Sequence, residues 1–298
     1  MRDSLYTIGG FKMAFAIANL MPRAFGQWLS PRIGLAAYAR SPEAQTALRQ
    51  NLQLVTGLKG PALDALCEEN VANFSRMLAD YFLCAGSNAN EQATKLLHHN
   101  GGEKNLAAAR ARGTGVIVAT GHLGHWELGG LMLAKLGLPL TVITLEEPSS
   151  ELTRWREACR RQLGIKTITV GPGHPFAFVE MMQTLRRNEL VAMLVDRPYA
   201  GSGAKVNLFG HETEFSTAPA LLAYHTGASV LPAFVIHDGE GGYRSMAEPP
   251  VPMETSGDLQ STIAENTQRI ASVFEGIIRR HPEQWFNYVP VWKKNGMG

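Results

Sequence analysis

From residue 113 onward, the chain alternates short apolar runs with longer stretches in which apolar residues recur every three or four positions. The short runs are rich in valine, isoleucine, leucine and threonine and are bounded by turns, as buried strands are. Strands that alternate with helices predict an α/β layered sandwich with a largely parallel central sheet flanked by helices. The expected strands are Val116–Thr120, Leu140–Leu145, Thr167–Val170, Leu190–Val195 and Val230–Ile236, and the expected helices are Trp126–Lys135, Leu152–Leu163, Pro175–Arg187 and Ala218–Thr226.

The two ends of the chain follow other patterns. From Ser41 to about Asn100, apolar residues recur at helical spacing, which predicts an N-terminal helical layer. Tyr243–Met246 is expected to add an edge strand, and Asp258–Arg280 a long helix. Because no internal repeat, low-complexity tract or linker interrupts the sequence, we expect a single domain over residues 1–298. Its helical part would span 1–100 and its α/β body 101–298.

Residues 8–29 are the most apolar part of the amino terminus, but Lys12, Asn19, Pro22 and Arg23 interrupt them. The uninterrupted run is shorter than the ~20 residues that a membrane-spanning helix needs. Two interpretations remain open: a helix that lies along a bilayer surface, or a segment that packs on the protein's own core. A signal peptide is not expected, because no small-residue cleavage site follows the apolar run. The residues that would meet a bilayer are Phe11, Phe15, Phe25 and Trp28, with Lys12, Arg23 and Arg32.

Composition narrows the classes of function. A hydrophobic content of 45% over 298 residues supports a sizeable core. The formal net charge of +2 is too small to indicate a nucleic-acid-binding protein. Cys67, Cys84 and Cys159 form no C-x-x-C pair, which is typical of a reducing compartment without disulfides. The histidines show no metal-ligand spacing, so we expect neither a metal nor a cofactor.

A glycine-framed stretch, Gly115–Gly130, joins the first strand of the body to the next helix and contains His122 and Glu127. On one continuous helix, side chains five positions apart point about 140° apart and could not meet. If His122 lies in the turn and Glu127 in the first helical turn, the carboxylate can reach back to the imidazole. Such a dyad fixes the tautomer and leaves the other ring nitrogen to take a proton from a hydroxyl. The alternative is a core histidine beside a carboxylate at a helix N-terminus, but the strand-end position and the glycines favour catalysis.

Two further groups of charged residues are candidates for a site. Asp196 and Arg197 follow the strand Leu190–Val195 and form either a loop salt bridge or part of a site at the carboxyl edge of the sheet. Asn207–Pro219 is expected to be a loop leading into a helix. No G-x-S-x-G elbow or phosphate-binding G-x-x-x-x-G-K-[ST] loop occurs, so a base at His122 would act on a hydroxyl of the substrate. A basic run, which could bind phosphate, support an oxyanion or simply face solvent, consists of Arg154, Arg156, Arg160, Arg161 and Lys166.

In combination and in order, these motifs resemble the bacterial lipid A biosynthesis (late) acyltransferases, within the lysophospholipid acyltransferase superfamily. The H-x4-E block at 121–128, the arginine-before-glycine block at 160–164 and the strand-end aspartate at 194–196 carry most of the resemblance. The segments 208–210 and 231–232, His281–Trp285 and Trp292-Lys293 also fit. The chain departs from the family pattern at His125, where Asn is usual, at Arg197, where many members carry a polar amide, and in the absence of a clear anchor helix.

The resemblance implies acyl transfer from a thioester, on acyl carrier protein or acyl-CoA, to a hydroxyl of a lipid acceptor such as a lipid A precursor or a lysophospholipid-like glycolipid. It implies a peripheral position on the cytoplasmic face of the bacterial inner membrane, with a membrane surface but no nucleic acid as partner. His122 and Glu127 would be catalytic, and Arg160, Arg161, Asp196 and Arg197 would stabilise the oxyanion or bind substrate. Two alternatives stay open: a lipid or thioester hydrolase that uses the same dyad on water, and a non-catalytic lipid-binding protein.

Overall fold

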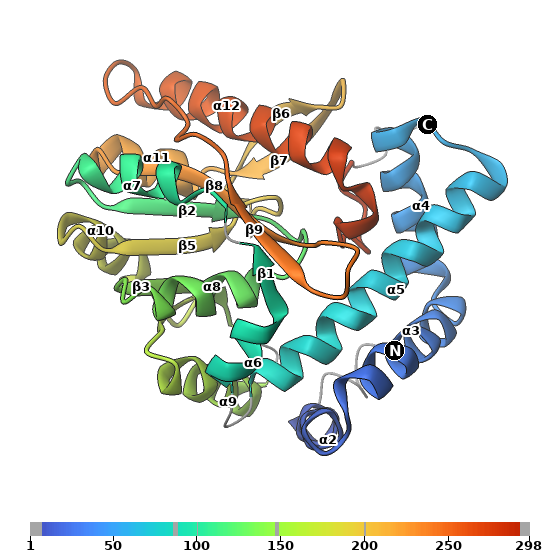
Figure 1. Ribbon diagram of the computed structural model, residues 1–298. Coiled ribbons are helices and arrows are strands. Elements are labelled where there is room, and N and C mark those ends of the chain that lie inside the picture. The colour runs from blue at the N-terminus through green and yellow to red at the C-terminus, as the bar shows by residue number, and fades with distance from the viewer. Residues whose placement is uncertain (1–7, 86–88, 100, 147–148, 200, 293–298) are drawn as a thin grey trace.

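The computed structural model describes residues 8–85, 89–99, 101–146, 149–199 and 201–292. A seven-stranded sheet forms its centre, in the order β1-β9-β8-β2-β5-β3-β4 (Figure 1). Neighbouring strands are parallel except β8 and β9, which are antiparallel. The predicted α/β sandwich with a largely parallel sheet is therefore confirmed. The strands are β1 (Leu97–His99), β2 (Val116–Thr120), β3 (Leu140–Leu145), β4 (Lys166–Val170), β5 (Leu190–Leu194), β8 (Ser229–His237) and β9 (Tyr243–Ala247).

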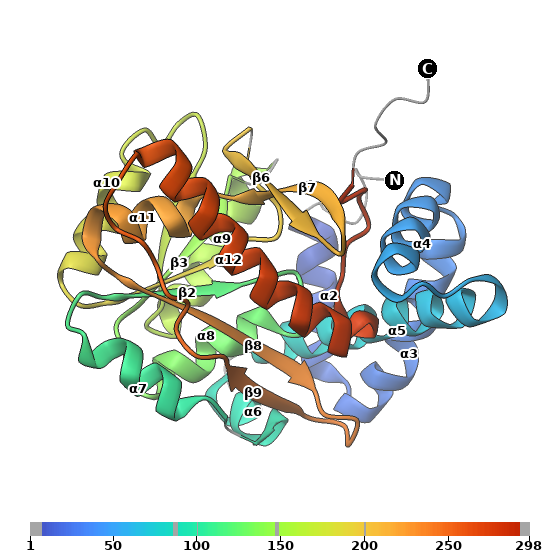
Figure 2. The ribbon, with the colours of Figure 1, turned by 90° about the horizontal axis from the view of Figure 1, so that it is seen from above.

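Helices cover both faces of this sheet (Figure 2). Residues alternate between the two faces along each strand. On β2, Ile117 and Ala119 enter one core, whereas Val116 and Val118 enter another. Burial on both faces explains why these strands are continuous apolar runs. The first core is covered by α10 (Ala177–Arg186), α11 (Ala218–Thr226) and α12 (Leu259–Arg280). The second core is covered by α7 (Glu103–Ala111) and α8 (Trp126–Lys135). Helix α9 (Ser150–Gln162) packs beside the edge strand β4.

The predicted N-terminal helical layer is also confirmed and stands beside the sheet (Figure 1). Within the layer, Arg23 on α3 bonds the buried Asp80 carboxylate on α5 with both contacts at 2.8 Å. The Tyr243 hydroxyl on β9 donates to the same carboxylate at 3.0 Å and so joins the layer to the body. Within the described ranges, no helix is long and apolar enough to cross a membrane. The layer consists of α2 (Ile8–Leu20), α3 (Arg23–Ala39), α4 (Pro42–Thr56), α5 (Gly60–Cys84) and α6 (Ala89–Leu96).

Three elements differ from the sequence-based expectations. Tyr243–Ala247 is a strand, as predicted, but it lies between β8 and β1 instead of at the sheet edge. The short edge strand β1 falls inside the stretch expected to be helical. The segment expected to be a loop forms an antiparallel hairpin of β6 (Gly203–Leu208) and β7 (His211–Ser216). Its two-residue turn is Phe209-Gly210, with φ of 54° and 79°, which matches the left-handed turns that favour hairpins.

Candidate active site

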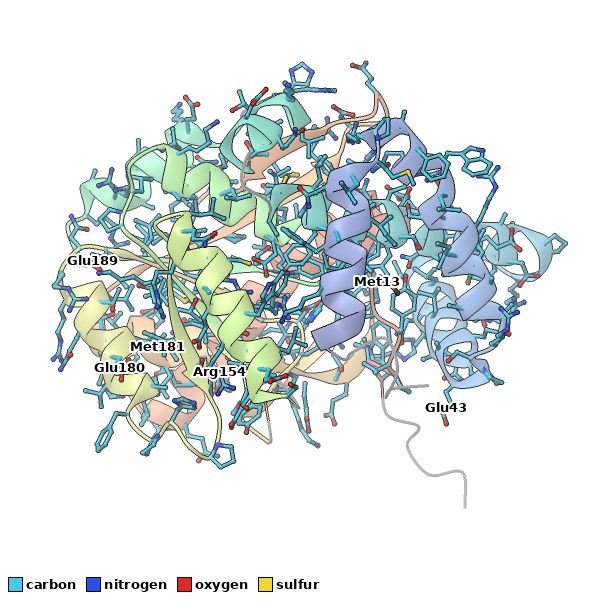
Figure 3. All side chains as sticks on the ribbon, turned by 90° about the horizontal axis from the view of Figure 1, so that it is seen from below. Met13, Glu43, Arg154, Glu180, Met181 and Glu189 are labelled. Atoms are coloured by element: carbon cyan, nitrogen blue, oxygen red, sulfur yellow. The ribbon has the colours of Figure 1, made fainter. Side chains whose placement is uncertain are left out.

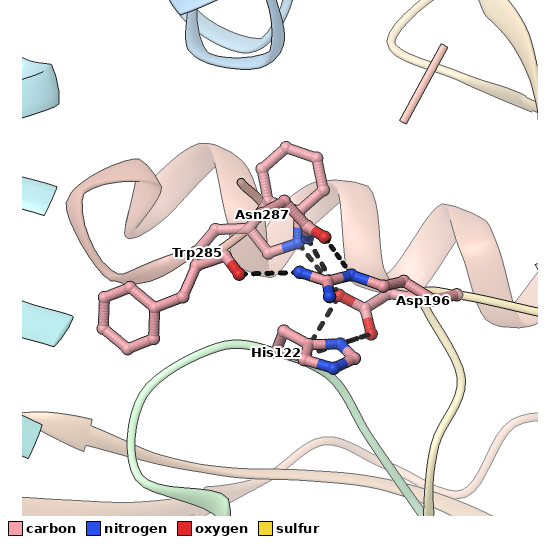
Figure 4. Close-up of polar contacts among 6 residues, drawn as sticks. His122, Asp196, Trp285 and Asn287 are labelled. Carbon is pink, nitrogen blue, oxygen red and sulfur yellow. Dashed lines mark hydrogen bonds and ion pairs between the residues drawn. The ribbon is translucent and has the colours of Figure 1, made fainter. Parts of the chain in front are cut away.

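The carboxyl ends of two neighbouring strands bring His122 and Asp196 together. β2 and β5 are parallel and in register, with Thr120 opposite Leu194. His122 and Asp196 each lie two residues beyond this last pair. His122 Nδ1 lies 2.8 Å from Asp196 Oδ1, and the His122 backbone N–H donates to the same carboxylate at 3.1 Å (Figure 4). Asp196 is therefore the carboxylate that orients the imidazole.

Asp196 is fully buried and ionised. Burial raises the pKa of its carboxyl group, but the adjacent His122 and Arg197 outweigh this effect and hold that pKa well below its ordinary value. A carboxylate accepts hydrogen bonds only, so the Nδ1 of His122 carries the proton and Nε2 is the basic nitrogen. The His122 side chain is 24% exposed, which leaves it within reach of a substrate.

The predicted hydrogen bond between Glu127 and His122 is not formed, and this pairing has to be corrected. Glu127 does lie in the first turn of α8, but its carboxylate faces α9 instead of the loop that carries His122. Arg160 bonds it through both Nε and Nη2, and Arg156 Nη2 donates to it at 3.3 Å. A catalytic role for Glu127 stays a prediction. In this arrangement Glu127 would act on the reaction through Arg156 and Arg160.

A second charged group, which consists of Glu127, Arg156 and Arg160, is largely buried. The Arg160 and Glu127 side chains are 11% and 17% exposed. Burial raises the pKa of Glu127, but Arg160 and Arg156 have the larger combined effect and lower it to about 2. The Arg156 guanidinium also lies over the ring of Tyr81 on α5, 5.8 Å from the ring centre. One carboxylate thus joins two guanidinium groups and links α8, α9 and α5.

His125 explains how α8 begins at its observed position. Its Nδ1 accepts a hydrogen bond from the Leu128 backbone N–H at 3.3 Å, and therefore caps the helix as an Asn side chain would. The residue is fully buried. Burial lowers the pKa of the His125 imidazole to about 4, which keeps the ring neutral and Nδ1 able to accept. The departure from Asn at this position is therefore compatible with the same local structure.

The remaining predicted residues have different surroundings. Arg197 donates through Nη2 to the Phe286 carbonyl at 2.8 Å and through Nε to Asn287 Oδ1, so it binds a C-terminal segment. Arg161 is exposed on α9, and the structure does not bring it into either charged group. Lys293, part of the C-terminal motif, lies outside the described residues. Across the described ranges, no cluster of three or more His, Cys, Asp or Glu side chains is arranged to hold a metal ion.

Sequence reasoning missed two groups around Asp196. Trp285 Nε1 and Asn287 Nδ2 donate to its Oδ2 atom at 3.1 and 3.2 Å (Figure 4). Trp285 belongs to the C-terminal motif noted in the sequence, so a signal for that residue existed. Nothing near Asn287 marks it as a neighbour of a residue 91 positions earlier in the chain.

A cavity of about 360 Å³ lies between α8 and the sheet, and its lining includes Trp126, the neighbour of His122. Its lining is mostly apolar, and Trp126, Glu127 and Arg160 form one end. The Trp126 ring also packs edge-on against the His122 imidazole, with ring centres 5.7 Å apart. Several small residues are part of its lining. These small residues include Gly129 and Gly130 on α8, Ala192 on β5 and Ala233 on β8.

The chain is similar in sequence to known acyltransferases. Residues 6–294 match the family described as bacterial lipid A biosynthesis acyltransferase. The chain is 31% identical over 248 residues to a phosphatidylinositol mannoside acyltransferase of Mycobacterium tuberculosis strain H37Rv, which covers 82% of this chain and 76% of that protein. It is 27% identical over 292 residues to a phosphatidylinositol mannoside acyltransferase of Mycolicibacterium smegmatis, which covers 95% of this chain and 90% of that one.

Proposed function

The chain belongs to the bacterial lipid A biosynthesis acyltransferase family, and we propose that it transfers a fatty acyl chain from an acyl thioester to a hydroxyl of a lipid acceptor. The donor is acyl carrier protein or acyl-CoA, and the acceptor is a glycolipid of the lipid A precursor or phosphatidylinositol mannoside type. One observation carries the proposal: an ionised Asp196 holds His122 next to Trp126, which forms one end of an apolar cavity.

The reaction follows from this arrangement. His122 Nε2 takes the proton of the acceptor hydroxyl while that oxygen attacks the thioester carbonyl carbon, and the carbonyl electron pair moves onto oxygen. The tetrahedral intermediate then expels the thiolate, which takes the proton back from Nε2 and leaves as a thiol. Asp196 stabilises the imidazolium formed between the two steps. General base catalysis of this kind contributes roughly 10²–10⁴-fold, and no covalent enzyme intermediate is required.

Arg160 is the proposed source of positive charge for the oxyanion. It lies at the same end of the cavity as Trp126, where the carbonyl of a chain bound in the cavity would emerge. Glu127 holds its guanidinium through two bonds and so fixes its direction before the substrate arrives. This assigns Glu127 to the orientation of Arg160 instead of to His122. Backbone amides after Gly121 would supply further donors.

The cavity also sets a length for the acyl chain. Its lining extends from Trp126 to Leu136, the length of α8, which is about 15 Å for ten residues at 1.5 Å each. An extended chain advances ~1.2 Å per bond, because a residue of three backbone bonds spans about 3.6 Å. The cavity therefore suits a chain of about 12 carbons.

We expect Ala192→Phe to shift the preference toward shorter acyl chains. Ala192 lines the middle of the cavity, at the level of Val118 on the neighbouring strand, so a phenyl ring there would block its deeper part. Rates with a series of acyl thioesters would be compared within each protein, which removes any general loss of activity. The ratio of the C8 rate to the C12 rate should rise about tenfold or more, because each excluded methylene removes about 0.8 kcal/mol of burial. An unchanged ratio would rule out the cavity as the acyl site.

The amino-terminal helices present apolar side chains to solvent. Met13, Ile17 and Leu20 on α2 are 63%, 46% and 84% exposed, whereas Phe15 packs inward against Trp155 on α9. Figure 3 shows Met13 and the cationic Arg154 on the same side of the molecule. The contact of Phe15 supports packing on the protein's own core, whereas the exposed side chains support the bilayer interpretation. The side chain of Phe11 lies outside the described residues.

These exposed side chains support peripheral attachment to the cytoplasmic face of the inner membrane, where a lipid acceptor is available. On α3, Phe25 and Trp28 are also exposed, and Arg32 lies 4.1 Å above the Trp28 ring. Apolar side chains flanked by cations are typical of interfacial helices on anionic bilayers. Because α2 packs on α9, and α9 carries Arg160, attachment there would bring the cavity mouth near the lipid.

The change Leu20→Asp should weaken binding to anionic vesicles by about tenfold or more, since burying a leucine contributes roughly 1.5–3 kcal/mol. Cosedimentation with phosphatidylglycerol-containing vesicles at low and high salt would measure this. Leu259→Asp is a matched control, because Leu259 is also exposed but lies at the start of α12. Equal binding by both variants and the wild type would remove this surface from the proposal.

The two alternatives make different products from the same substrate. A hydrolase releases free fatty acid whether or not an acceptor lipid is present, whereas a binding protein releases nothing. The purified protein, incubated with a labelled acyl thioester with and without a glycolipid acceptor, should form labelled lipid only when the acceptor is added. Labelled free acid at the same rate in both reactions would overturn the transferase proposal in favour of hydrolysis.

A further inference from the structure

The C-terminal segment after α12 runs along the catalytic loop. This segment, residues 282–291, is called the strap below. The Phe286 backbone N–H donates to the His122 carbonyl at 2.6 Å, and the Gly124 N–H donates to the Gln284 carbonyl at 3.0 Å. Trp285 and Leu123 form an antiparallel bridge between the two segments. The strap is therefore hydrogen-bonded to the turn that carries the base, which places its side chains around Asp196.

Asn287 contacts the catalytic carboxylate directly. Its Nδ2 donates to Asp196 Oδ2 at 3.2 Å, and its own Oδ1 accepts from Arg197 Nε. A carboxylate on one side and a guanidinium on the other allow only this orientation of the amide. Asn287 is fully buried. A second donor, Trp285 Nε1, reaches the same oxygen at 3.1 Å. The side-chain partners of the two Asp196 oxygens thus differ: Oδ2 binds Asn287 and Trp285 of the strap, and Oδ1 binds the His122 ring, while the His122 backbone N–H lies 3.1 Å from both oxygens.

We propose that Asn287 is a positioning residue of the reaction, which holds Asp196 so that Oδ1 stays aimed at His122 Nδ1. This inference rests on the proposed function and adds to it a role for the strap. Without Asn287, Oδ2 keeps Trp285 Nε1 and the His122 backbone N–H as donors but loses one of its two side-chain donors, so the carboxylate is held less firmly and can shift relative to the imidazole. The donor also shares the negative charge of Asp196, and so limits how strongly this carboxylate stabilises protonated His122.

Asn51 provides a control, because it holds the same strap without touching Asp196. Its Nδ2 donates to the carbonyls of Asn287 and Val289 at 3.0 and 2.8 Å, and its Oδ1 accepts from the Val291 N–H at 3.1 Å. Asn51 lies on α4 and is buried. If Asn287 only fastens the strap, Asn51→Ala and Asn287→Ala should have the same consequences. If Asn287 positions Asp196, their effects on the dyad should differ.

The first readout is the pH dependence of the rate. The charged or titratable groups that face Asp196 are His122 and Arg197, and Arg197 stays protonated throughout the accessible range. Loss of the Asn287 donor leaves more of the carboxylate charge to stabilise the imidazolium. The inactive protonated form then persists to higher pH, so the acid limb of the kcat profile should move upward in Asn287→Ala. Asn51→Ala should lower the melting temperature but leave the acid limb in place.

The second readout is the size of the decrease in kcat. We expect Asn287→Ala to lower kcat by about 10- to 100-fold with little change in KM, as is common when a group that orients a functional side chain is removed. Asn287→Ser, which keeps a short donor, should recover part of the loss and covers the case in which the alanine variant does not fold. An acid limb that coincides with the wild type in both Asn287 variants would overturn the proposal, as would an equal shift in Asn51→Ala.

Protonation of the His122 ring, followed by histidine NMR in the same variants, separates this inference from the reaction itself. The NMR experiment needs no substrate. If the wild-type protein failed to transfer acyl chains but the His122 titration still moved upward in Asn287→Ala only, the proposed function would fail while the positioning role would stand. If transfer occurred but the titration was the same in all variants, the positioning role would fail alone.

Discussion

His122→Ala is expected to lower the rate of acyl transfer by roughly 10²–10⁴-fold, because it removes the general base. Asp196→Asn should be about as damaging, by up to ~10⁴-fold. The amide would present an N–H to Nδ1 and so favour the tautomer with its proton on Nε2, which cannot act as a base. Steady-state kinetics with an acyl thioester and a glycolipid acceptor would measure both effects. The double variant should be little worse than either single one, since groups that act as a unit are non-additive.

His125→Asn is the matched control for these variants. It changes a histidine in the same loop but retains an acceptor for the Leu128 N–H, so helix α8 should keep its N-terminus. We expect near wild-type kinetics. Near-normal activity in His122→Ala, or fully additive losses in the double variant, would contradict the assignment of His122 and Asp196 as a catalytic pair.

Glu127→Gln should reduce both stability and activity, for a different reason. It removes the carboxylate charge that is paired with Arg160, a largely buried cation, and breaking a buried pair in this way typically costs about 3–5 kcal/mol. The free energy of unfolding from denaturant titration at neutral pH would show the loss. Activity should fall as well, because the Arg160 guanidinium loses the carboxylate that orients it.

The difference in unfolding free energy between the wild type and Glu127→Gln should depend on pH in a definite direction. The pKa of Glu127 is lowered to about 2 in the folded protein, below its value in the unfolded chain. The stabilisation is therefore complete above the unfolded pKa, about 4.3, and is lost as the pH falls toward 2. The gap in unfolding free energy between the wild type and Glu127→Gln should shrink between pH 5 and about 3. A gap that stayed constant or grew on acidification would contradict the ion pair.

Arg160→Lys tests the same ion pair by changing its cationic partner. An ammonium group cannot reproduce the two bonds that the guanidinium makes to Glu127. We therefore expect even this conservative change to lower kcat in steady-state kinetics. Arg154→Lys is the control, since Arg154 is an exposed residue of the same helix. Surface substitutions usually change stability by less than about 0.5 kcal/mol. Small and equal effects on kcat at the two positions would contradict a role for Arg160 in the reaction.

The sheet could be predicted from the sequence because its strands are buried on both faces. β2 and β3 appear as uninterrupted apolar or threonine-containing runs, and both were predicted with their observed bounds. β7 was missed because its apolar positions alternate with charge: Thr213 and Phe215 are buried, whereas Glu212 and Glu214 lie between and beside them. That alternation is a signal for a half-buried strand, but the nearby histidine and glutamates conceal it.

The site could be predicted only in part, because its central contact is long-range. His122 and Asp196 were each recognised as strand-end residues, but their pairing depends on β2 and β5 being adjacent and in register. Spacing within one motif instead favoured Glu127, whose partners lie on α9, about 30 residues away. The strap contacts were beyond local reasoning, because the tertiary fold alone brings Asn287 to Asp196.

The tautomer of the neutral His122 ring tests the central claim most directly. Nitrogen-15 NMR of histidine-labelled protein distinguishes a ring with its proton on Nδ1 from one with its proton on Nε2. We predict the Nδ1–H form in the wild type and in Glu127→Gln, and the Nε2–H form in Asp196→Asn, since only Asp196 accepts from Nδ1. An Nε2–H ring in the wild type, or a tautomer that changes with Glu127 and not with Asp196, would contradict the account.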